Sequence, residues 1–480
     1  MRSDRRRLAV ALVATAAVLV PLGWYWQASL VPDTYDAMDM GYLDHGGGTV
    51  PAGHDAHAGR RVADLVAEAG PADVRMTLAA RKERFRLASG VEVDGYTVNG
   101  SSPGPVLQAT QGDLVEVRLE NDSVPDGVTL HWHGIDVPNA ADGVAGVTQD
   151  AVRPGKSHVY RFRVEAAGTY WYHSHQLSHE QVQRGLFGAV VVAPAERSPL
   201  DVQEELAVLH VYDATSTVNG RVGDVQVDAP AGRRVRVRVV NTDNGATAVW
   251  ATGSSYRVLA VDGTDVHEPG PVTDQAVQLT AGGRVDLEVT APARVELGGG
   301  NALILGAGAD AGTPPTRQLD LLAYGAPRPL PFDPEQADRR FVYDVGRRPG
   351  FLDGRPGMWW SINGHLFPDV PMYVVEEGDV VRMRVSNHSG ESHPMHLHGH
   401  HAVVLSRNGQ QATGSPWVVD SLEVANGESY ELAFVADNPG LWMDHCHNLP
   451  HAAQGLVAHL AYAGVASSYR IGGQAHNQPE

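Results

Sequence analysis

The sequence predicts an all-β protein in which one β-sandwich is repeated three times. Its 480 residues include 53 Gly and 30 Pro, which alternate with short apolar runs and indicate the many turns of such a fold. A glycine, an alternating apolar and charged strand and an asparagine recur together at residues 112–121, 232–241 and 378–387. Recurrence on this scale indicates three copies of one sandwich domain.

The length and composition are those of a folded protein of about three domains. Hydrophobic residues make up 43% of the chain and charged residues 19%, which excludes a disordered or fibrous protein. The formal net charge of −19 argues against a nucleic-acid partner, because phosphate binding requires a basic surface. This charge suits a neutral or cationic substrate, including a metal ion, unless it serves solubility alone.

Residues 1–30 are predicted to be a signal peptide or a signal anchor. A basic start precedes an apolar run from Leu8 to about Trp26, which is nearly long enough to span a bilayer. No convincing small-x-small cleavage site follows, and Trp24-Tyr25-Trp26 is typical of a membrane interface. A retained anchor is therefore favoured over a cleaved peptide. In both cases the basic start predicts export of the remainder, as a membrane-tethered or secreted extracytoplasmic protein.

Residues 31–71 show little apolar periodicity and are predicted to form a flexible tether. This segment contains the following possible ligands: Met38, Met40, His45, His54 and His57. Thioether and imidazole groups suit copper. A disordered linker that happens to carry these residues explains them equally well, so both interpretations stay open.

Three β-rich units and a short C-terminal tail follow the tether. The predicted boundaries are 72–198 for the first unit, 199–337 for the second unit with its Pro-rich linker, 338–466 for the third unit and 467–480 for the tail. Period-two alternation, as in half-buried strands, is clearest at 115–119, 159–164, 234–239, 285–289 and 380–385.

Four histidine clusters carry the chemistry. They lie at residues 131–133, 173–175, 393–398 and 445–451, and each contains His-x-His. On a strand, residues i and i+2 face the same side about 6.6 to 7 Å apart along the chain. Such a pair holds two neighbouring metal ions or two positions around one metal cluster. Two clusters in the first unit and two in the third indicate metal binding rather than chance.

The triplet His445-Cys446-His447 contains the only cysteine of the chain. In an extended segment the two histidines point to one face and the cysteine to the other. A Cys thiolate with two imidazoles is the ligand set of a blue copper electron-transfer site, and His393 and His451 are the candidates for the imidazoles. His445 and His447 then serve a separate metal cluster, and the short covalent path from Cys446 connects the two sites.

These four segments resemble the four copper-binding motifs of the multicopper oxidases, the laccase-like family, in order and spacing. Residues 393–399 match the family's His-Pro-x-His-Leu-His-Gly, and residues 445–456 match its His-Cys-His-x-x-x-His-x-x-x-Gly-Leu form. The similarity covers roughly residues 85–465. It implies three consecutive cupredoxin-like Greek-key β-sandwich domains, of which the middle one, lacking His-x-His and Cys, is free of copper.

The resemblance also implies four copper ions and a ligand set for each copper type. The ligands are His393, Cys446 and His451 for type 1, His131 and His396 for type 2, and His133, His173, His175, His398, His445 and His447 for the type 3 pair. The trinuclear cluster of type 2 and type 3 copper is therefore expected between the first and third domains. His400 and His401, which follow the third motif, are left without a copper role.

Two further positions follow from the resemblance. Asp142 matches a family Asp near the type 2 copper, where an acid has a task because O₂ reduction to water consumes four protons. A turn Asp before Gly143 is the plainer interpretation. Leu456 occupies the axial position of the type 1 site, where many bacterial relatives have Met. Leucine cannot coordinate, so a three-coordinate type 1 site is expected.

The resemblance implies an oxidase that takes single electrons from a phenol or aromatic amine through Cys446 and reduces O₂ to water. A metallo-oxidase for Cu(I), Mn(II) or Fe(II), acting in copper tolerance or metal homeostasis, is the alternative. A two-copper nitrite reductase is disfavoured because its chemistry needs no histidines beside Cys446. A copper-binding protein without turnover is disfavoured by the complete ligand set. We expect a monomer whose partners are O₂ and a small reductant or metal ion, held at a membrane if residues 1–30 stay uncleaved.

Overall fold

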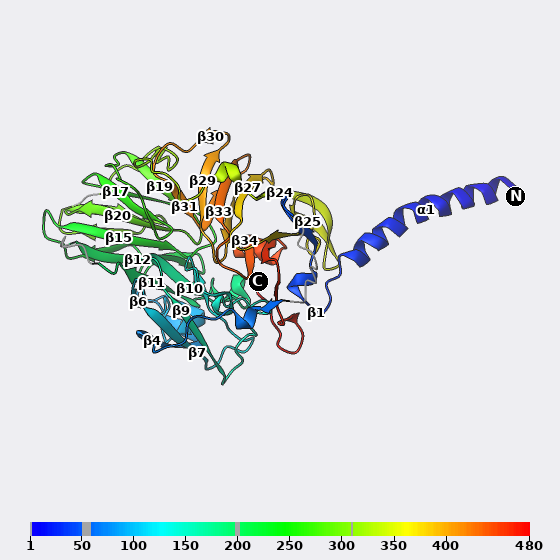
Figure 1. The fold of residues 1–480 in the computed structure, drawn as a ribbon, viewed down its shortest axis with the longest axis horizontal. Coiled ribbons are helices and arrows are strands. Elements are labelled where there is room, and N and C mark those ends of the chain that lie inside the picture. Colours follow the sequence, from blue (N-terminus) through cyan, green and yellow to red (C-terminus); the bar gives the residue numbers. More distant parts are fainter. Residues whose placement is uncertain (1, 50–58, 197–201, 309–310) are drawn as a thin grey trace.

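The computed structural model describes residues 2–49, 59–196, 202–308 and 311–480. β-Strands are the main regular structure, and they form three sandwiches of two sheets each, with a separate hydrophobic core in each (Figure 1). The predicted all-β class is therefore confirmed. Helices are confined to α1 (Arg2–Ala28), α2 (Ser178–Gln181), α3 (Leu449–Ala453) and the 3₁₀ turns η1 (Ala37–Asp39), η2 (Val62–Asp64), η3 (Asn139–Ala141) and η4 (Pro334–Gln336) within the described ranges.

The first sandwich holds two four-stranded sheets. One sheet has the order β5-β4-β7-β9 and the other β6-β11-β10-β8. The strands are β4 (Val74–Arg86), β5 (Glu92–Val98), β6 (Leu107–Thr110), β7 (Leu114–Asn121), β8 (His131–His133), β9 (Ser157–Arg163), β10 (Gly168–His173) and β11 (Phe187–Ala193). The second sheet thus carries two of the histidine clusters at its edge.

The second sandwich holds two six-stranded sheets, β13-β12-β15-β20-β17-β18 and β14-β22-β21-β16-β19-β23. The strands of the first sheet are β12 (Gln203–Tyr212), β13 (Thr215–Val218), β15 (Arg234–Asn241), β17 (Tyr256–Val261), β18 (Thr264–Asp265) and β20 (Arg284–Thr290). Those of the second sheet are β14 (Asp224–Val227), β16 (Thr247–Thr252), β19 (Gln275–Leu279), β21 (Ala293–Glu296), β22 (Ala302–Leu305) and β23 (Arg317–Gln318).

The third sandwich pairs the sheet β25-β24-β27-β33-β29-β30 with the sheet β2-β26-β35-β34-β28-β32, while β31 joins β29. The first sheet consists of β24 (Arg339–Leu352), β25 (Arg355–Ile362), β27 (Val380–Asn387), β29 (Ala402–Arg407), β30 (Gln410–Gln411), β31 (Trp417–Val419) and β33 (Ser429–Val435). The second sheet consists of β2 (Tyr42–Asp44), β26 (Pro371–Val375), β28 (His393–Leu397), β32 (Ser421–Val424), β34 (Leu441–Cys446) and β35 (Val457–Tyr462). This second sheet carries the other two histidine clusters.

The internal repeat occupies the same place in all three sandwiches. The repeated strands β7, β15 and β27 each pair in parallel with the strand that opens their sandwich and antiparallel with a later strand. The glycine before each strand, Gly112, Gly232 or Gly378, has a positive φ that other residues rarely adopt. The repeat therefore marks one structural position three times.

The asparagine that ends each repeat closes a loop of its sandwich. Asn121, Asn241 and Asn387 are all buried. The side-chain amide of Asn121 donates hydrogen bonds to the carbonyls of Val124 and Val152, at 2.9 and 2.7 Å. The other two asparagines bond to two backbone carbonyls or more in the same way. Buried backbone carbonyls need such partners, which explains why the repeat ends in asparagine.

The described part of residues 31–71 packs against the third sandwich rather than forming a free tether. β1 (Thr34–Tyr35) pairs with β37 (Ile471–Gly472), β2 joins β26, and β3 (Arg60–Arg61) pairs with β36 (Val465–Ala466). The side chains of Met38 and Met40 are buried in the core of that domain. Strands of two or three residues show no periodicity in a sequence, which is why this order was not predicted. His54 and His57 lie outside the described residues.

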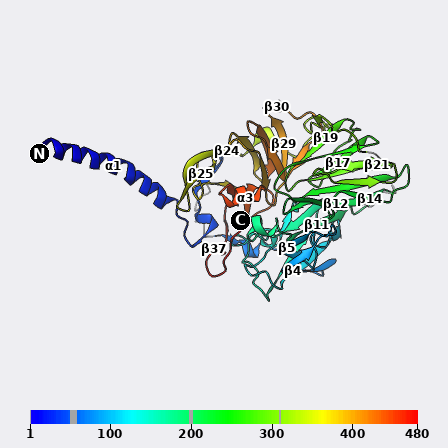
Figure 2. The same cartoon turned by 180° about the vertical axis from the view of Figure 1, so that it is seen from behind.

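Helix α1 projects from the globular part and is exposed along its described length (Figures 1 and 2). By length and composition its residues 5–28 could cross a membrane, a test that a signal sequence also passes. The chain after the helix is fixed to the β24–β25 hairpin, because the carbonyl and hydroxyl of Ser29 accept hydrogen bonds from the amides of Asp353 and Gly354, both at 3.1 Å.

Candidate metal centre

Strand pairing brings the four histidine clusters together. In the first sandwich β8 and β10 are neighbours, and His131 lies opposite His173. In the third sandwich β28 and β34 are neighbours, and His396 lies opposite His445. The ring centroids of His131 and His396 are 5.6 Å apart, so the two edges meet between the domains. Most of the predicted ligands therefore surround one buried space.

Three predicted ligands form a separate triangle. The Sγ atom of Cys446 lies 3.6 Å from Nδ1 of His393 and 3.8 Å from Nδ1 of His451, and these two nitrogens are 3.2 Å apart. The other ring nitrogen of His393 contacts the Ser389 hydroxyl at 2.7 Å, which helps to orient the ring. One sulfur and two imidazole nitrogens that converge on one point are the donor set of a blue copper site.

Burial controls the protonation of this triangle. It lowers the pKa of His393 to about 3 and also lowers that of His451, so both rings are neutral at pH 7. It raises the pKa of the Cys446 thiol well above its usual value. A bound cation reverses this effect, because a coordinating thiol is deprotonated outright. The donor set therefore fits a metal ion.

Leu456 lies beside the triangle and is fully buried. Its amide donates to the carbonyl of His451, and its carbonyl accepts from the amide of Cys446, both at 3.1 Å. Its backbone is thus tied to two members of the triangle. Its side chain contains no donor atom, so any contact that it makes with a metal there is apolar.

The second group of donors also fits metal ions. Nε2 of His131 lies 3.4 Å from Nε2 of His396, and Nε2 of His398 lies 3.2 Å from Nε2 of His445. Two imidazole nitrogens this close need a shared proton or cation. Donor atoms within 4.8 Å of one another occur in the groups His131–His396–His398, His175–His398–His445 and His133–His396–Asp420.

Unpartnered nitrogens support the same conclusion. Within the described ranges, Nε2 of His173, His175 and His447 is buried and has no hydrogen-bond partner. Burial lowers the pKa of His175 and of His447 to about 3, and that of His173 well below its usual value. Buried polar atoms are nearly always paired, and neutral imidazole is the form that binds metals. The burial, the missing partners and the neutral form of these three nitrogens suit metal binding.

Asp142 contacts predicted ligands from two domains. Its Oδ1 atom lies 3.0 Å from Nδ1 of His131 and 3.1 Å from Nδ1 of His398. Elsewhere, Nδ1 of His396 and of His175 faces a backbone carbonyl, at 2.8 and 3.0 Å. When Nδ1 carries the hydrogen and donates it to such an oxygen, the ring orientation is fixed and Nε2 is free to bind a metal. Asp142 is thus more than a turn residue, because it joins the first and third domains through their histidines.

The middle domain reaches the histidine cluster through Arg284, which the sequence did not reveal. This arginine, 1% exposed, forms a double hydrogen bond to Asp420 of the third domain, one of them at 2.6 Å. Its Nε donates to the Thr169 carbonyl of the first domain at 3.1 Å, and its Nη1 lies 3.4 Å from Nδ1 of His133. One side chain of the middle domain therefore bonds to both other domains.

Charges around Arg284 are compensated. Burial raises the pKa of Asp262 to about 6, against the attraction of Arg284. Burial would also raise the pKa of Asp420, but Arg284 and His401 lower it to about 2.

The only sequence signal for the approach of the middle domain to the histidine cluster is the pair Gly282-Gly283 before β20. A Cβ on Gly282 would come within 2.7 Å of the His133 ring, so the loop needs glycine to approach the cluster.

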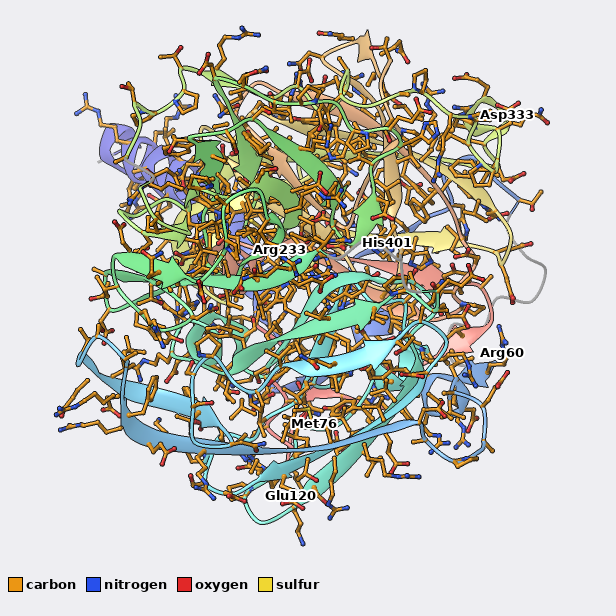
Figure 3. The ribbon with its side chains drawn as sticks, turned by 90° about the vertical axis from the view of Figure 1, so that its left-hand side faces the viewer. Arg60, Met76, Glu120, Arg233, Asp333 and His401 are labelled. Atoms are coloured by element: carbon orange, nitrogen blue, oxygen red, sulfur yellow. The ribbon has the colours of Figure 1, made fainter. Side chains whose placement is uncertain are left out.

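His401 connects Asp420 to a more exposed carboxylate. It lies 3.4 Å from Asp420 and 3.2 Å from Asp136, whose side chain is 53% exposed. Burial lowers the pKa of His401, but the two carboxylates outweigh it and hold that pKa well above its usual value. Figure 3 labels His401 near the middle of the view. His401 is therefore a partly buried ion-pair partner of Asp136 and Asp420.

Residues 476–480 also reach the cluster, although the sequence indicated only a tail. Oε1 of Glu480 lies 3.2 Å from Nδ1 of His445 and 3.9 Å from Nε2 of His175. The Ser178 hydroxyl donates to its other oxygen at 2.5 Å, and the Pro479 carbonyl accepts from His175. Burial raises the pKa of Glu480 to about 8. No local pattern predicts such a contact, because it joins residues about 300 positions apart.

Two family models, both described as multicopper oxidase, match residues 79–197 and 339–464. Laccase-1 of Botryotinia fuckeliana is 27% identical over 77% of this chain and 79% of its own length. Multicopper oxidase MmcO of Mycobacterium tuberculosis is 28% identical over 81% of this chain and 87% of its own length. The crystal structure of a multi-copper oxidase from Pseudomonas thermotolerans, 28% identical, superposes with a TM-score of 0.69 over 82% of this chain and all of that one.

Three sandwiches with a histidine–cysteine triangle and a histidine cluster define a copper-dependent oxidoreductase that uses O₂ as acceptor. The chain belongs to the laccase-like multicopper oxidase family, whose members bind one type 1, one type 2 and two type 3 copper ions. The predicted family and cofactor are confirmed.

Proposed function

We propose that this protein oxidises phenols or aromatic amines one electron at a time and that electrons enter at His451. The observation that carries this proposal is the difference in exposure within the triangle. The side chain of His451 is 11% exposed, whereas His393 and Cys446 are fully buried. A reductant in solution therefore meets His451 first.

The surroundings of His451 suit a small reductant that loses a proton with its electron. A carboxylate oxygen of Glu391 lies 3.5 Å from Nε2 of His451, and Arg347 holds Glu391 at 2.9 Å. Trp360 packs against His451 with ring centroids 4.5 Å apart. A carboxylate beside the exposed imidazole can accept a hydrogen bond from a phenol or an aromatic amine.

We assign the ligands as the family resemblance implies. They are His393, Cys446 and His451 for type 1, His131 and His396 for type 2, and His133, His173, His175, His398, His445 and His447 for type 3. When bound, the copper ions supply the one-electron redox centres through which O₂ is reduced to water. The chain contributes the covalent path from Cys446 to His445 and His447, because these residues are adjacent in sequence.

Elemental analysis tests this assignment most directly. The loaded protein should contain about four copper ions per chain, as the three ligand groups require. One copper or none in fully loaded protein would overturn the assignment.

Oxygen uptake with phenols, aromatic amines, Cu(I), Mn(II) and Fe(II) then identifies the reductant. Faster turnover with a metal ion than with every organic reductant would favour the metallo-oxidase, for which Glu391 offers an oxygen ligand.

We expect Asp142→Asn to leave type 1 reduction intact and to slow reoxidation by O₂ by roughly 100-fold. An amide keeps the shape of the carboxylate that joins His131 and His398 but cannot supply a proton. The defect should grow at higher pH, where protons are scarcer. Stopped-flow reoxidation measures it. Asp113→Asn, which changes a turn Asp bonded to the Thr110 amide, is the matched control; equal rates for both variants would reduce Asp142 to a structural residue.

We expect Leu456→Met to lower the reduction potential of the blue centre. A thioether at the axial position donates electron density to Cu(II), which leucine cannot do. The side chains have similar volumes, so repacking should cost less than about 1.5 kcal/mol. Redox titration of the blue absorption measures the shift. Leu460→Met, at another buried position of the same domain, should leave the potential unchanged. An unchanged or higher potential in the Leu456 variant would show that this side chain does not face the copper.

We also propose that the protein is exported and held at a membrane by α1 as a monomer. The basic start and the apolar residues 5–28 support this location. Fractionation of membranes, with N-terminal sequencing of the released protein, distinguishes an anchor from a cleaved signal peptide.

A further inference from the structure

A cavity of about 540 Å³ lies between the N-terminal segment, the turn after α3 and residues 478–480. Two methionines and a histidine from three separate segments line it, namely Met40, Met443 and His459. None of the three belongs to the four-copper ligand set. Thioether and imidazole groups are the donors that soft metal ions prefer, which makes this cavity chemically distinct from an ordinary gap in the core.

Strand register places these donors on one face of the sheet. Met443 on β34 and His459 on β35 are antiparallel partners, so their Cβ atoms are about 5 Å apart on the same side. Met372 on β26 is the partner of His459 on its other side. A methionine, a histidine and a methionine therefore lie in a row across three strands, and Met40 approaches the cavity from the N-terminal segment.

His459 is the unusual member of this row. Its side chain is 2% exposed, and among the described residues its Nε2 atom has no hydrogen-bond partner. Leaving a buried polar atom unpaired destabilises a protein, so a packing role alone does not account for histidine here. Burial lowers the pKa of His459 to about 4, so the ring is neutral at pH 7 and a ring nitrogen can bind a metal.

We propose that Met40, Met443 and His459 form a Cu(I)-binding site separate from the four copper ions of the family. Two thioethers and a neutral imidazole match the preference of Cu(I) for soft ligands. A monovalent ion also costs less to bury than a divalent one, because the cost of desolvation rises with charge. Met372 offers a third thioether beside them.

The proposed Cu(I) site lies close to His445, which we assign to the type 3 copper pair. Met443 precedes His445 by two residues on β34, so the two side chains share a face about 7 Å apart along the strand. Glu480, which lines the same cavity, lies 3.2 Å from His445. A Cu(I) ion held by Met40, Met443 and His459 therefore stands on the way from the cavity to a type 3 ligand.

The test is a Cu(I) titration of the copper-loaded, fully reduced protein under argon, in competition with the chromogenic chelator bicinchoninate. We expect one Cu(I) per chain beyond those already present, with an increase in sulfur scattering in the copper X-ray absorption spectrum above that due to Cys446. Removing even the outer partner of a metal ligand costs roughly 10- to 100-fold in affinity. Met40→Leu and His459→Leu should therefore each weaken the additional ion by about 100-fold.

Met383→Leu is the matched control, because Met383 is equally buried in the same domain and does not line the cavity. It should bind the additional Cu(I) as the unchanged protein does. The blue absorption after reoxidation reports the original copper ions in every variant. If His459→Leu does not fold, Met40→Leu decides alone. The proposal is wrong if no additional Cu(I) binds, or if Met40→Leu binds it as tightly as Met383→Leu.

Discussion

Replacing Cys446 by serine should abolish the blue absorption and the oxidation of every reductant while the fold persists. Cys446 is the only cysteine in the chain, so no other thiolate can take its place. Its sulfur lies within 3.8 Å of both imidazoles of the triangle, and its two neighbours belong to the buried histidine cluster. Absorption spectra and oxygen uptake measure the loss, which should exceed 1,000-fold because about 4 kcal/mol or more of transition-state stabilisation disappears.

The stability of this variant should change little. A serine hydroxyl in the buried position costs about 1–3 kcal/mol if it stays unpaired. Ala458→Ser adds the same hydroxyl to a neighbouring buried position of β35 without removing a ligand, and should keep both colour and activity. Elemental analysis of Cys446→Ser should find about three copper ions. Continued substrate oxidation in this variant would refute the assignment of Cys446 as the path for electrons.

Replacing Arg284 by methionine should destroy the trinuclear centre and leave the blue centre in place. The substitution removes the buried cation that Asp420 and Asp262 share and leaves Asp420 with His401 alone, at a cost of about 3–5 kcal/mol. It also removes the contact of Arg284 with Asp420, which lies 3.4 Å from His133 and 3.6 Å from His396. Loss of such outer support costs roughly 10- to 100-fold in metal affinity. We expect the blue band to be reduced by substrate and its reoxidation by O₂ to fail.

Arg238→Met separates this local effect from a general loss of stability. Arg238 is 3% exposed, lies on the neighbouring strand β15 and pairs with Asp286 and Glu204. Its replacement should cost similar stability in thermal unfolding but leave the type 2 signal in electron paramagnetic resonance unchanged. If Arg284→Met retains four copper ions and normal reoxidation, the middle domain does not support the cluster.

The sequence identified the parts of the site that depend on local spacing. The His-x-His pairs and the triplet around Cys446 are recognisable because the two-residue period of a strand fixes their relative direction. Arg284, Asp420 and Glu480 escaped prediction because each acts across a domain boundary. Such contacts depend on how three sandwiches pack, and nothing in the neighbouring residues reveals the partner.

The difference between local patterns and long-range contacts also explains which strands could be predicted from the sequence. The strands of the repeat were predictable because each is long enough to alternate, follows a turn glycine and ends in an asparagine with a defined structural task. The N-terminal segment was not, because β1 and β2 together contain five residues, two and three respectively. Their order comes from pairing with the third sandwich, which a local pattern does not contain.

The bonds of Arg284 have a consequence for how the protein unfolds. A chain of three sandwiches with separate cores would ordinarily melt in steps, because domains behave as independent folding units. Here one buried cation is shared by the first, second and third sandwiches. Unfolding any one of them breaks ion pairs and hydrogen bonds of Arg284 that also involve the other two. The stability of all three sandwiches is therefore linked. We therefore expect the middle sandwich, whose described residues contribute none of the proposed ligands, to make unfolding more cooperative.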